Sequence, residues 1–284
     1  MFFRKSLHIN ETLKAPLASI GLSEFQDFFD YSGGLLVSRP SKRPVRSLYL
    51  TVAGDRKKYF LKQVWGETIR GVLKALRRHQ VHHSIAIREL FILEFFRDQG
   101  IPVMNAVAWG ERKVFGWPVE GFILVEEVVG RKFVEVYRDV SLRTRRRMMW
   151  VYGELMGALH HRGIMSKVLL RDLICISQVY TTFWKCLVVI DREHGLSYSV
   201  NISLKQRGRA LGEIWVKGAA LFIRGERSEL LAFLAGYFAA CNMRKSQKDM
   251  RVILIQSTLL CATEILSNDD RFRSFRQSFK SVKS

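Results

Sequence analysis

Apolar and polar side chains alternate along two neighbouring segments in the first quarter of the chain. Residues 45–52 (VRSLYLTV) alternate with a period of two, and residues 57–65 (KKYFLKQVW) form a second apolar and aromatic run. Between them, Ala53–Arg56 (AGDR) contains a Gly-Asp pair that is typical of turns. We therefore expect a β-hairpin. Residues 1–44 show no sustained period, and we expect an irregular lead-in there.

Helical and strand patterns succeed one another further along the chain. Residues 84–99 have apolar positions at helical spacing, and a following Gly-Ile-Pro sequence stops this helix. The other predicted elements are helices at 66–79 and 141–161 and strands at 103–109, 121–129, 174–176 and 187–190, with mainly helix thereafter. Strands therefore come first and helices afterwards. This segregation predicts an α+β fold with a β-rich small lobe at 1–127 and an α-rich large lobe at 128–284, which ends in a basic helix.

Two charged residues lie inside apolar segments. Lys62 is in the middle of the strand at 57–65, and Glu89 falls in the apolar stripe of the helix at 84–99. A carboxylate in such a stripe is costly unless it is paired, and Lys62 is an obvious partner. The pair would match the strand lysine and helix glutamate of the protein-kinase fold, where the lysine contacts nucleotide phosphates. The alternatives are a lysine that points into water and a helix turned so that Glu89 is solvated.

Further candidates follow these two residues in the chain. The strand at 187–190 ends in Asp191, where a kinase-like aspartate would hold Mg²⁺; the alternative is an ordinary turn aspartate. Residues 122–129 (FILVEEVV) look like the strand and linker that join two lobes. Adenine would then pair with backbone groups near Glu126 and Val128, with a plain buried strand as the alternative. No GxGxxG segment is present, so a phosphate-covering loop would be atypical.

The charge of the chain bears on its partners. The 284 residues carry a net charge of +20, with a pI near 10.2. Such a field attracts polyanions, which include nucleic acid, anionic lipid and phosphorylated glycolipid. Basic residues gather at 74–79, 143–147 and 271–283, and we expect these clusters to dock on an anionic membrane unless they are simply solvated faces. Nucleic acid is not the expected partner, because no helix-turn-helix, RRM-like aromatic pair or zinc module is recognisable.

Nothing in the sequence predicts secretion or a membrane span. The N-terminal residues lack a continuous apolar region and a small-residue cleavage site. The longest apolar run, residues 230–241, is shorter than the ~18 residues needed to cross a bilayer. The four cysteines form no CxxC pair, which argues against zinc and redox motifs and fits a reducing compartment. We therefore expect a soluble or peripheral protein on the cytoplasmic side.

Taken in order, these segments resemble the Kdo/WaaP lipopolysaccharide-kinase family between about Arg46 and Cys241. The segments that carry the resemblance are YFLKQVWG at 59–66, AIREL at 86–90, GIPVMNAVAWGER at 100–112, the strand at 121–128, LHHRGI at 159–164, VID at 189–191 and the helical region at 206–238. The resemblance implies a two-lobed kinase-like fold and ATP-dependent transfer of phosphate to a heptose or Kdo of the lipopolysaccharide inner core. It also implies that Lys62, Glu89 and Asp191 correspond to the family's lysine, glutamate and metal aspartate.

The catalytic loop departs from this family pattern. The family has His-x-Asp just after the Gly-Ile that ends the long helix, and an ungapped comparison places residues 166–168 (SKV) there, with no aspartate. A comparison with a four-residue insertion places Asp172 at the catalytic position and Ser177 at the second metal-ligand position. Two hypotheses stay open. Asp172 is the catalytic base, or it is a structural residue paired with Arg171 in a catalytically impaired protein.

The expected function is that of a cytoplasmic kinase, peripheral to the inner membrane, which phosphorylates the lipopolysaccharide core glycolipid. Lys62 would position the phosphates of ATP, and Glu89 would hold Lys62. Asp191 would bind Mg²⁺, and Asp172 would orient the sugar hydroxyl and accept its proton. The alternative is a kinase-fold protein that binds a nucleotide or a partner without catalysis. A weaker third hypothesis is a basic nucleic-acid-binding protein.

Overall fold

The structure is a computed structural model, which describes residues 3–38, 43–66, 83–165, 168–176, 183–191, 197–198, 202–222, 227–243 and 247–268. The chain forms two compact units. The first unit contains the residues up to Val128, and the second begins at Val129. Asp191 belongs to the first unit, although the strand that precedes it belongs to the second.

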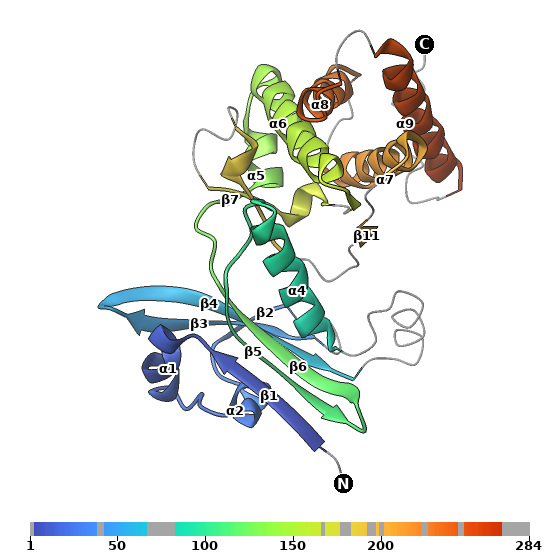
Figure 1. Ribbon diagram of the computed structural model, residues 1–284. Helices are drawn as coiled ribbons and strands as arrows, with labels where there is room; N and C mark the ends of the chain where they lie inside the picture. Colours follow the sequence, from blue (N-terminus) through green and yellow to red (C-terminus); the bar gives the residue numbers. More distant parts are fainter. Residues whose placement is uncertain are drawn as a thin grey trace. The chain divides into compact units, whose positions relative to one another are not determined.

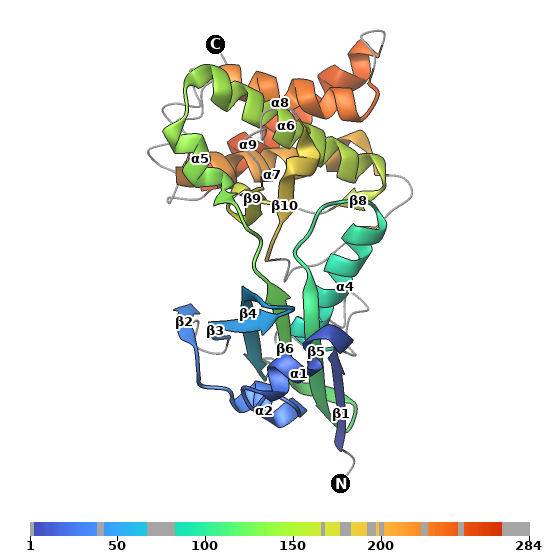
Figure 2. The same cartoon turned by 90° about the vertical axis from the view of Figure 1, so that its left-hand side faces the viewer.

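A six-stranded antiparallel sheet forms the centre of the first unit. Its strands are β1 (Phe3–Ile9), β2 (Leu35–Ser38), β3 (Val45–Val52), β4 (Asp55–Trp65), β5 (Ala106–Val114) and β6 (Trp117–Glu126), in the order β1-β5-β6-β4-β3-β2. Figure 2 shows β1 and β2 at the two edges of this sheet. The predicted hairpin is confirmed, since β3 pairs with β4 in antiparallel register. Its turn has positive φ at Ala53 (51°) and Gly54 (88°), as a two-residue type I′ connection requires.

The expectation of an irregular segment at 1–44 is wrong. This segment contains β1 and β2 and also two short helices, α1 (Glu11–Ala18) and α2 (Phe25–Asp30). Helices of this length are too short to show a clear period, and α1 contains a proline. Packing against the sheet stabilises them, because isolated helices this short are not stable in water. Figure 1 shows α1 and α2 on one side of the sheet and α4 (Ile85–Asp98) on the other.

The core of the first unit lies between the sheet and the two short helices. Its buried side chains are Leu13, Leu17, Leu22, Phe25, Phe28, Phe29, Leu48, Leu50, Tyr59, Leu61, Val107, Ala108, Phe122 and Leu124. Gln63 is also buried here, and its Nε2 donates to the carbonyl oxygens of Phe28, Phe29 and Tyr31 at 2.8–3.0 Å. These carbonyls lie at the end of α2, where a helix leaves acceptors without an internal partner. Gln63 therefore fixes α2 to β4.

The opposite face of the sheet carries the helix predicted at 84–99. Helix α4 begins after Ser84, whose side-chain oxygen accepts a hydrogen bond from the Ile87 amide at 3.3 Å. It ends just before Gly100, which adopts a positive φ of 69°. The next strand, β5, starts three residues later than the predicted segment at 103–109. The helix expected at 66–79 lies outside the described residues.

Helices and short strands make up the second unit. The helices are α5 (Phe133–Asp139), α6 (Leu142–His161), α7 (Leu204–Phe222), α8 (Arg227–Ala240) and α9 (Lys248–Asn268), with short 3-10 helices η1 (Leu170–Asp172) and η2 (Trp184–Cys186). The strands are β7 (Arg131–Lys132), β8 (Ile164–Met165), β9 (Leu173–Cys175), β10 (Leu187–Val189) and β11 (Ser197–Tyr198). The long helix predicted at 141–161 is confirmed, with Ser141 as its N-cap. Strands β9 and β10, which pair in antiparallel register, correspond to the predicted strands at 174–176 and 187–190.

Helices α6 and α8 pack closely because each carries a glycine at the contact (Figure 2). A Cβ atom on Gly153 would lie 2.0 Å from the carbonyl oxygen of Phe233. A Cβ atom on Gly236 would lie 1.9 Å from the carbonyl oxygen of Trp150. Both distances are far below van der Waals contact, so any larger residue must separate the helices.

Candidate active site

Lys62 and Glu89 form an ion pair in the first unit. The alternation of β4 turns Gln63 toward α2 and Lys62 toward the opposite face, which α4 covers. Glu89 lies on the buried stripe of α4, with a side chain only 3% exposed. Its Oε1 atom lies 2.7 Å from the Nζ atom of Lys62. The predicted ion pair is therefore confirmed.

Asp191 provides a second carboxylate to the same lysine. Its Oδ1 atom lies 2.5 Å from the Nζ atom of Lys62. Asp191 has a positive φ of 60°, in the left-handed region that few residues other than glycine and asparagine or aspartate adopt. Such backbone conformations cluster at functional sites, where the surrounding structure holds a side chain in place. Two carboxylates from separate segments of the sequence thus meet at the ammonium group of Lys62.

The electrostatic balance of this cluster keeps Lys62 charged. Burial alone lowers the pKa of the Lys62 ammonium, but the carboxylates of Glu89 and Asp191 outweigh it, so its pKa is raised above the ordinary lysine value. Glu89 is enclosed, whereas the side chain of Asp191 is 58% exposed. The cluster therefore combines a fixed cation with one accessible carboxylate, which is a suitable arrangement for a phosphate group and its counter-ion.

The accessible carboxylate of Asp191 fits Mg²⁺. Within the described ranges, no three histidine, cysteine, aspartate or glutamate side chains converge into a metal site. Mg²⁺ does not require one, because it commonly binds through one or two carboxylates together with substrate phosphates and water. Ser177, the second expected metal ligand, lies outside the described residues. Asp191 is thus the metal-ligand candidate that the described part of the chain offers.

Glu126 and Val128 lie at the end of β6, where the first unit ends. The Glu126 amide donates to the Asn105 carbonyl at 2.8 Å, and its side chain lies 3.4 Å from Lys57 Nζ. An adenine would therefore have to use the Glu126 carbonyl rather than its amide. Val128 makes none of the turn and loop backbone hydrogen bonds found among the described residues. Contact of Glu126 and Val128 with adenine stays a prediction.

Asp172 lies in the second unit, at the end of η1 and directly before β9. Its Oδ2 atom accepts a hydrogen bond from the Leu169 amide at 3.4 Å, and its Oδ1 atom lies 3.5 Å from Arg171 Nε. The Asp172 carbonyl accepts from the Ile190 amide at 2.8 Å, which joins the loop to the end of β10. Val168, at the aspartate position of the ungapped comparison, is fully buried. The catalytic role of Asp172 stays a prediction.

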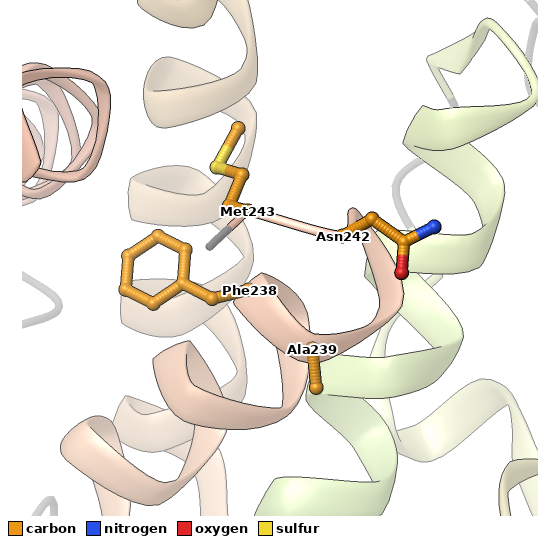
Figure 3. A pocket seen from close by; sticks show the side chains of 4 residues that line it. All are labelled: Phe238, Ala239, Asn242 and Met243. Atoms are coloured by element: carbon orange, nitrogen blue, oxygen red, sulfur yellow. The ribbon is translucent and has the colours of Figure 1, made fainter. Parts of the chain in front are cut away.

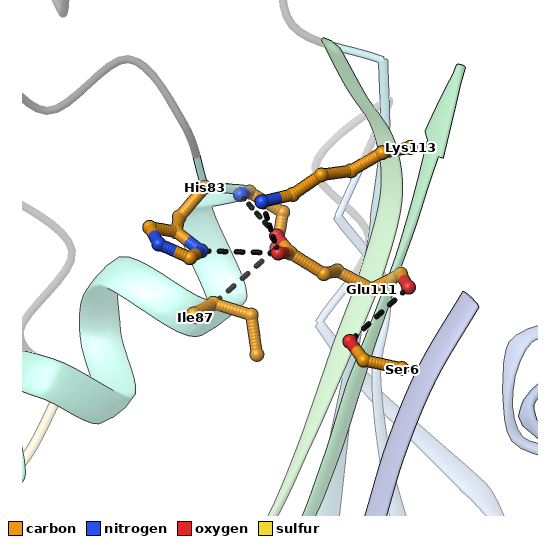
Figure 4. A network of polar contacts seen from close by, with 6 residues as sticks. Ser6, His83, Ile87, Glu111 and Lys113 are labelled. Carbon is orange, nitrogen blue, oxygen red and sulfur yellow. Dashed lines mark hydrogen bonds and ion pairs between the residues drawn. The ribbon is translucent and has the colours of Figure 1, made fainter. Parts of the chain in front are cut away.

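Glu111 is a buried carboxylate that sequence reasoning missed. It lies on β5, and Figure 4 shows the side chains of His83 and Lys113 pointing toward its carboxylate. The Ser84 amide donates to its Oε2 at 2.9 Å, while His83 Nδ1 and Lys113 Nζ lie 3.0 and 2.8 Å from its Oε1. Glu111 thus fastens the first turn of α4, the helix that carries Glu89, to the sheet. The only sequence signal was an acidic residue inside a strand, which is more often solvated.

A small pocket of about 390 Å³ lies at the end of α8 in the second unit (Figure 3). It is lined by Phe238, Ala239, Asn242 and Met243. These side chains include no charged group that could hold a phosphate or a metal ion. The pocket therefore contributes nothing to the chemistry of the cluster at Lys62.

One of the three predicted basic clusters can be located in the described structure. On α6, Arg145 lies 3.6 Å from the buried Glu229 and over the ring of Tyr137, while Arg147 lies over Trp150. These two arginines are thus engaged within the second unit, whereas Arg143 is exposed. The clusters at 74–79 and 271–283 lie outside the described residues. Among the described helices, none is both long and apolar enough to cross a bilayer.

Comparison with known proteins gives a match to a family model over part of the chain and a likeness in fold. Residues 36–169 match the model of the "Lipopolysaccharide kinase (Kdo/WaaP) family". A similar solved structure is "WaaP in complex with acyl carrier protein", with a TM-score of 0.55 and 19% identity over 98% of this chain and 100% of that chain. A weaker likeness is to "aminoglycoside-3'-phosphotransferase of type VIII", with a TM-score of 0.47 and 12% identity over 88% of this chain and 100% of that one. No curated protein sequence matches the chain.

These findings confirm two expectations from the sequence. The resemblance to the Kdo/WaaP family is confirmed over the matched range. The α+β kinase-like fold is confirmed by the likeness to WaaP, which at this identity shows the fold alone. The matched range includes Lys62, Glu89, Glu126 and Val128 and ends before Asp172 and Asp191.

Proposed function

We propose, from the match of residues 36–169 to the lipopolysaccharide kinase (Kdo/WaaP) family, that this chain transfers a phosphoryl group from ATP to a heptose or Kdo of the lipopolysaccharide inner core. The observation that carries the proposal is the cluster of Lys62, Glu89 and Asp191. Phosphoryl transfer depends mainly on positioning and on electrostatic stabilisation of the phosphate groups. A partly buried cation held by two carboxylates, one of them accessible, supports that role.

Each residue of the cluster has a distinct part in this proposal. The ammonium of Lys62 binds oxygens of the ATP phosphates, and Glu89 orients it through their 2.7 Å contact. Asp191 would hold Mg²⁺, which when bound neutralises charge on the phosphate oxygens. The Glu126 carbonyl and the backbone of Val128 would hold adenine.

Asp172 is the proposed catalytic base. It would accept the proton of the attacking sugar hydroxyl and orient that hydroxyl toward the transferred phosphate. Two observations support the alternative, a catalytically impaired protein that binds a nucleotide or partner. The carboxylate of Asp172 already lies 3.5 Å from Arg171. In addition, the family match ends at residue 169, before this loop.

The proposed place of action is the cytoplasmic surface of the inner membrane. The net charge of +20 supports attraction to anionic lipid and to the phosphates of the core glycolipid. The similar WaaP structure is a complex with acyl carrier protein. We propose an acyl carrier protein as a further partner of this chain, and co-purification from cells that express a tagged full-length chain would test that part separately.

Transfer of labelled phosphate from ATP to purified core glycolipid tests the proposed activity. We expect the wild-type chain to label the glycolipid and Lys62→Met to lose at least about 10²-fold in rate, because the phosphate-binding cation is gone. Lys14→Met is the matched control, since Lys14 is an exposed lysine of α1 that pairs with Glu11 of the same helix. Equal loss in both variants would remove Lys62 from the site.

A further inference from the structure

The hairpin between β5 and β6 has a large aromatic residue where its turn disfavours one. Its central residues, Phe115 and Gly116, have φ of 50° and 80°. A type I′ turn needs positive φ at both positions and favours asparagine, aspartate or glycine. For a residue with a bulky side chain the left-handed conformation is unfavourable. The β3–β4 hairpin has the same geometry with Ala53 and Gly54, so the turn itself does not require an aromatic residue.

The same tip exposes a second aromatic side chain. Phe115 is 70% exposed and Trp117 is 47% exposed. A Cβ atom added to Gly116 would meet no atom within 4 Å, so the space beside the turn is open. Two exposed aromatic side chains on either side of Gly116 are unfavourable in water and indicate a surface that is covered in use.

Basic side chains flank this aromatic tip. The register of the sheet places Arg4 opposite Lys113 and Lys5 opposite Arg112, directly beside the turn. Arg112 and Lys113 pair with Glu120 and Glu111, whereas Arg4 and Lys5 are exposed. This end of the sheet therefore has exposed aromatic side chains at the β5–β6 turn and exposed cations on the neighbouring strand β1.

We propose that the β5–β6 tip is a membrane-insertion element, in which Phe115 and Trp117 enter the interfacial layer of an anionic bilayer while Arg4 and Lys5 contact lipid headgroups. Aromatic residues favour this layer, and nearby cations are attracted to anionic headgroups. The exposed cations Arg4 and Lys5 beside the aromatic side chains favour an anionic bilayer over an uncharged protein surface as the occupant. The inference rests on the membrane association in the proposed function, and it assigns that association to a segment outside all three basic clusters.

Binding of the full-length chain to vesicles tests this element. The vesicles are equimolar phosphatidylcholine and phosphatidylglycerol, with pure phosphatidylcholine for comparison. We expect Phe115→Asn and Trp117→Ser each to weaken partitioning about tenfold, since each removes one ring from the interfacial layer. Phe115→Asn should unfold at the same temperature as the wild type or higher, because asparagine suits a type I′ turn. Weaker binding by this variant therefore cannot be attributed to misfolding.

Two control variants distinguish insertion of the β5–β6 tip from the effect of changing any hairpin turn or any exposed apolar side chain. Ala53→Asn makes the matching change in the β3–β4 turn, and Leu260→Ser removes another exposed apolar side chain, 68% exposed on α9. Both should bind as the wild type does. A third variant, Trp117→Phe, should still bind, but Trp fluorescence should lose the part that brominated acyl chains quench in the wild type.

Three results would overturn the proposal. If wild type and Phe115→Asn bind anionic vesicles equally, another surface carries the membrane association, which itself stands. If the wild type binds no vesicle, the proposed insertion element and the proposed membrane association are both wrong. The proposed kinase activity is not affected by this result, because phosphate transfer is measured separately. If Phe115→Asn instead abolishes self-association of the chain, as measured by analytical ultracentrifugation, the tip is an interface between two copies.

Discussion

At the scale of single residues, the candidate site consists of three charged groups that meet although they are far apart in sequence. Lys62 contacts Glu89 and Asp191 at 2.7 and 2.5 Å. The first contact was predictable, because a carboxylate inside an apolar helical stripe requires a partner. The second was not, because the left-handed conformation that positions Asp191 leaves no mark in the sequence.

Replacement of Asp191 tests its assignment to Mg²⁺. We expect Asp191→Asn to bind ATP with little or no dependence on Mg²⁺, whereas the wild type should bind more tightly when Mg²⁺ is present. Isothermal titration calorimetry with and without Mg²⁺ provides the measurement. Because the amide keeps the shape of the side chain, an unchanged Mg²⁺ dependence in the variant would show that the ion binds elsewhere.

Replacement of Asp172 tests the catalytic base. We expect Asp172→Asn to lose about 10²–10⁴-fold in the rate of phosphate transfer, with ATP affinity nearly unchanged, because the base acts on the acceptor and not on the nucleotide. Arg171→Gln is the matched variant, since it removes the 3.5 Å neighbour but leaves the carboxylate. Equal rates for wild type and Asp172→Asn would make Asp172 structural.

At the scale of elements, α4 is the most important helix for the candidate site, because it positions Glu89 beside Lys62. Its beginning is fixed by Glu111, which accepts from the Ser84 amide and lies within 3.0 Å of His83 and Lys113. A negative charge at a helix N-terminus also interacts favourably with the helix dipole. The position of Glu89 thus depends on a carboxylate on the neighbouring strand.

Removal of the Glu111 charge should loosen this helix. We expect Glu111→Gln to lower the free energy of unfolding by about 1–3 kcal/mol and to speed amide hydrogen exchange in the first turns of α4. Phosphate transfer should fall as well, because Glu89 is held less firmly. Glu120→Gln is the control, since Glu120 pairs with Arg112 on the sheet. Similar exchange in α4 for both variants would argue against the anchoring role.

The contact between α6 and α8 gives a second test at this scale. We expect Gly236→Ala to destabilise the chain by about 1–3 kcal/mol or more, because the added methyl group would overlap the Trp150 carbonyl. Urea unfolding measures the change, with Leu231→Ala on the exposed side of α8 as control. If Gly236→Ala unfolds at the wild-type urea concentration, the two helices are not packed as closely as described.

The elements also show where prediction from sequence succeeds and fails. Long periodic segments such as α4 and α6 were predictable to within one or two residues, because both periodicity and N-cap serines mark them. The helices α1 and α2 were missed, since they owe their stability to packing against the sheet, α1 on β3 and α2 on β4 and β6, rather than to local pattern. Gln63 illustrates this, because its three hydrogen bonds to α2 join residues more than thirty positions apart.

At the scale of the whole molecule, the family match over part of the chain and the likeness in fold both point to a kinase-like protein, while the loop that contains Asp172 lies beyond the matched range. The family match covers the lysine and glutamate of the cluster and ends at residue 169. The cluster itself is assembled within the first unit, with Asp191 as its most accessible member. A functional kinase and a nucleotide-binding protein without catalysis share all of these features and differ in whether phosphate leaves ATP.

The most direct measurement is therefore the fate of purified core glycolipid after incubation with the wild-type chain, ATP and Mg²⁺, followed by mass spectrometry. We expect one added phosphate on a heptose or Kdo, which disappears when Mg²⁺ is chelated or when Lys62→Met replaces the wild type. An unmodified glycolipid, under conditions where calorimetry shows that the chain has bound ATP, would rule out the proposed kinase activity and favour a kinase-fold binding protein.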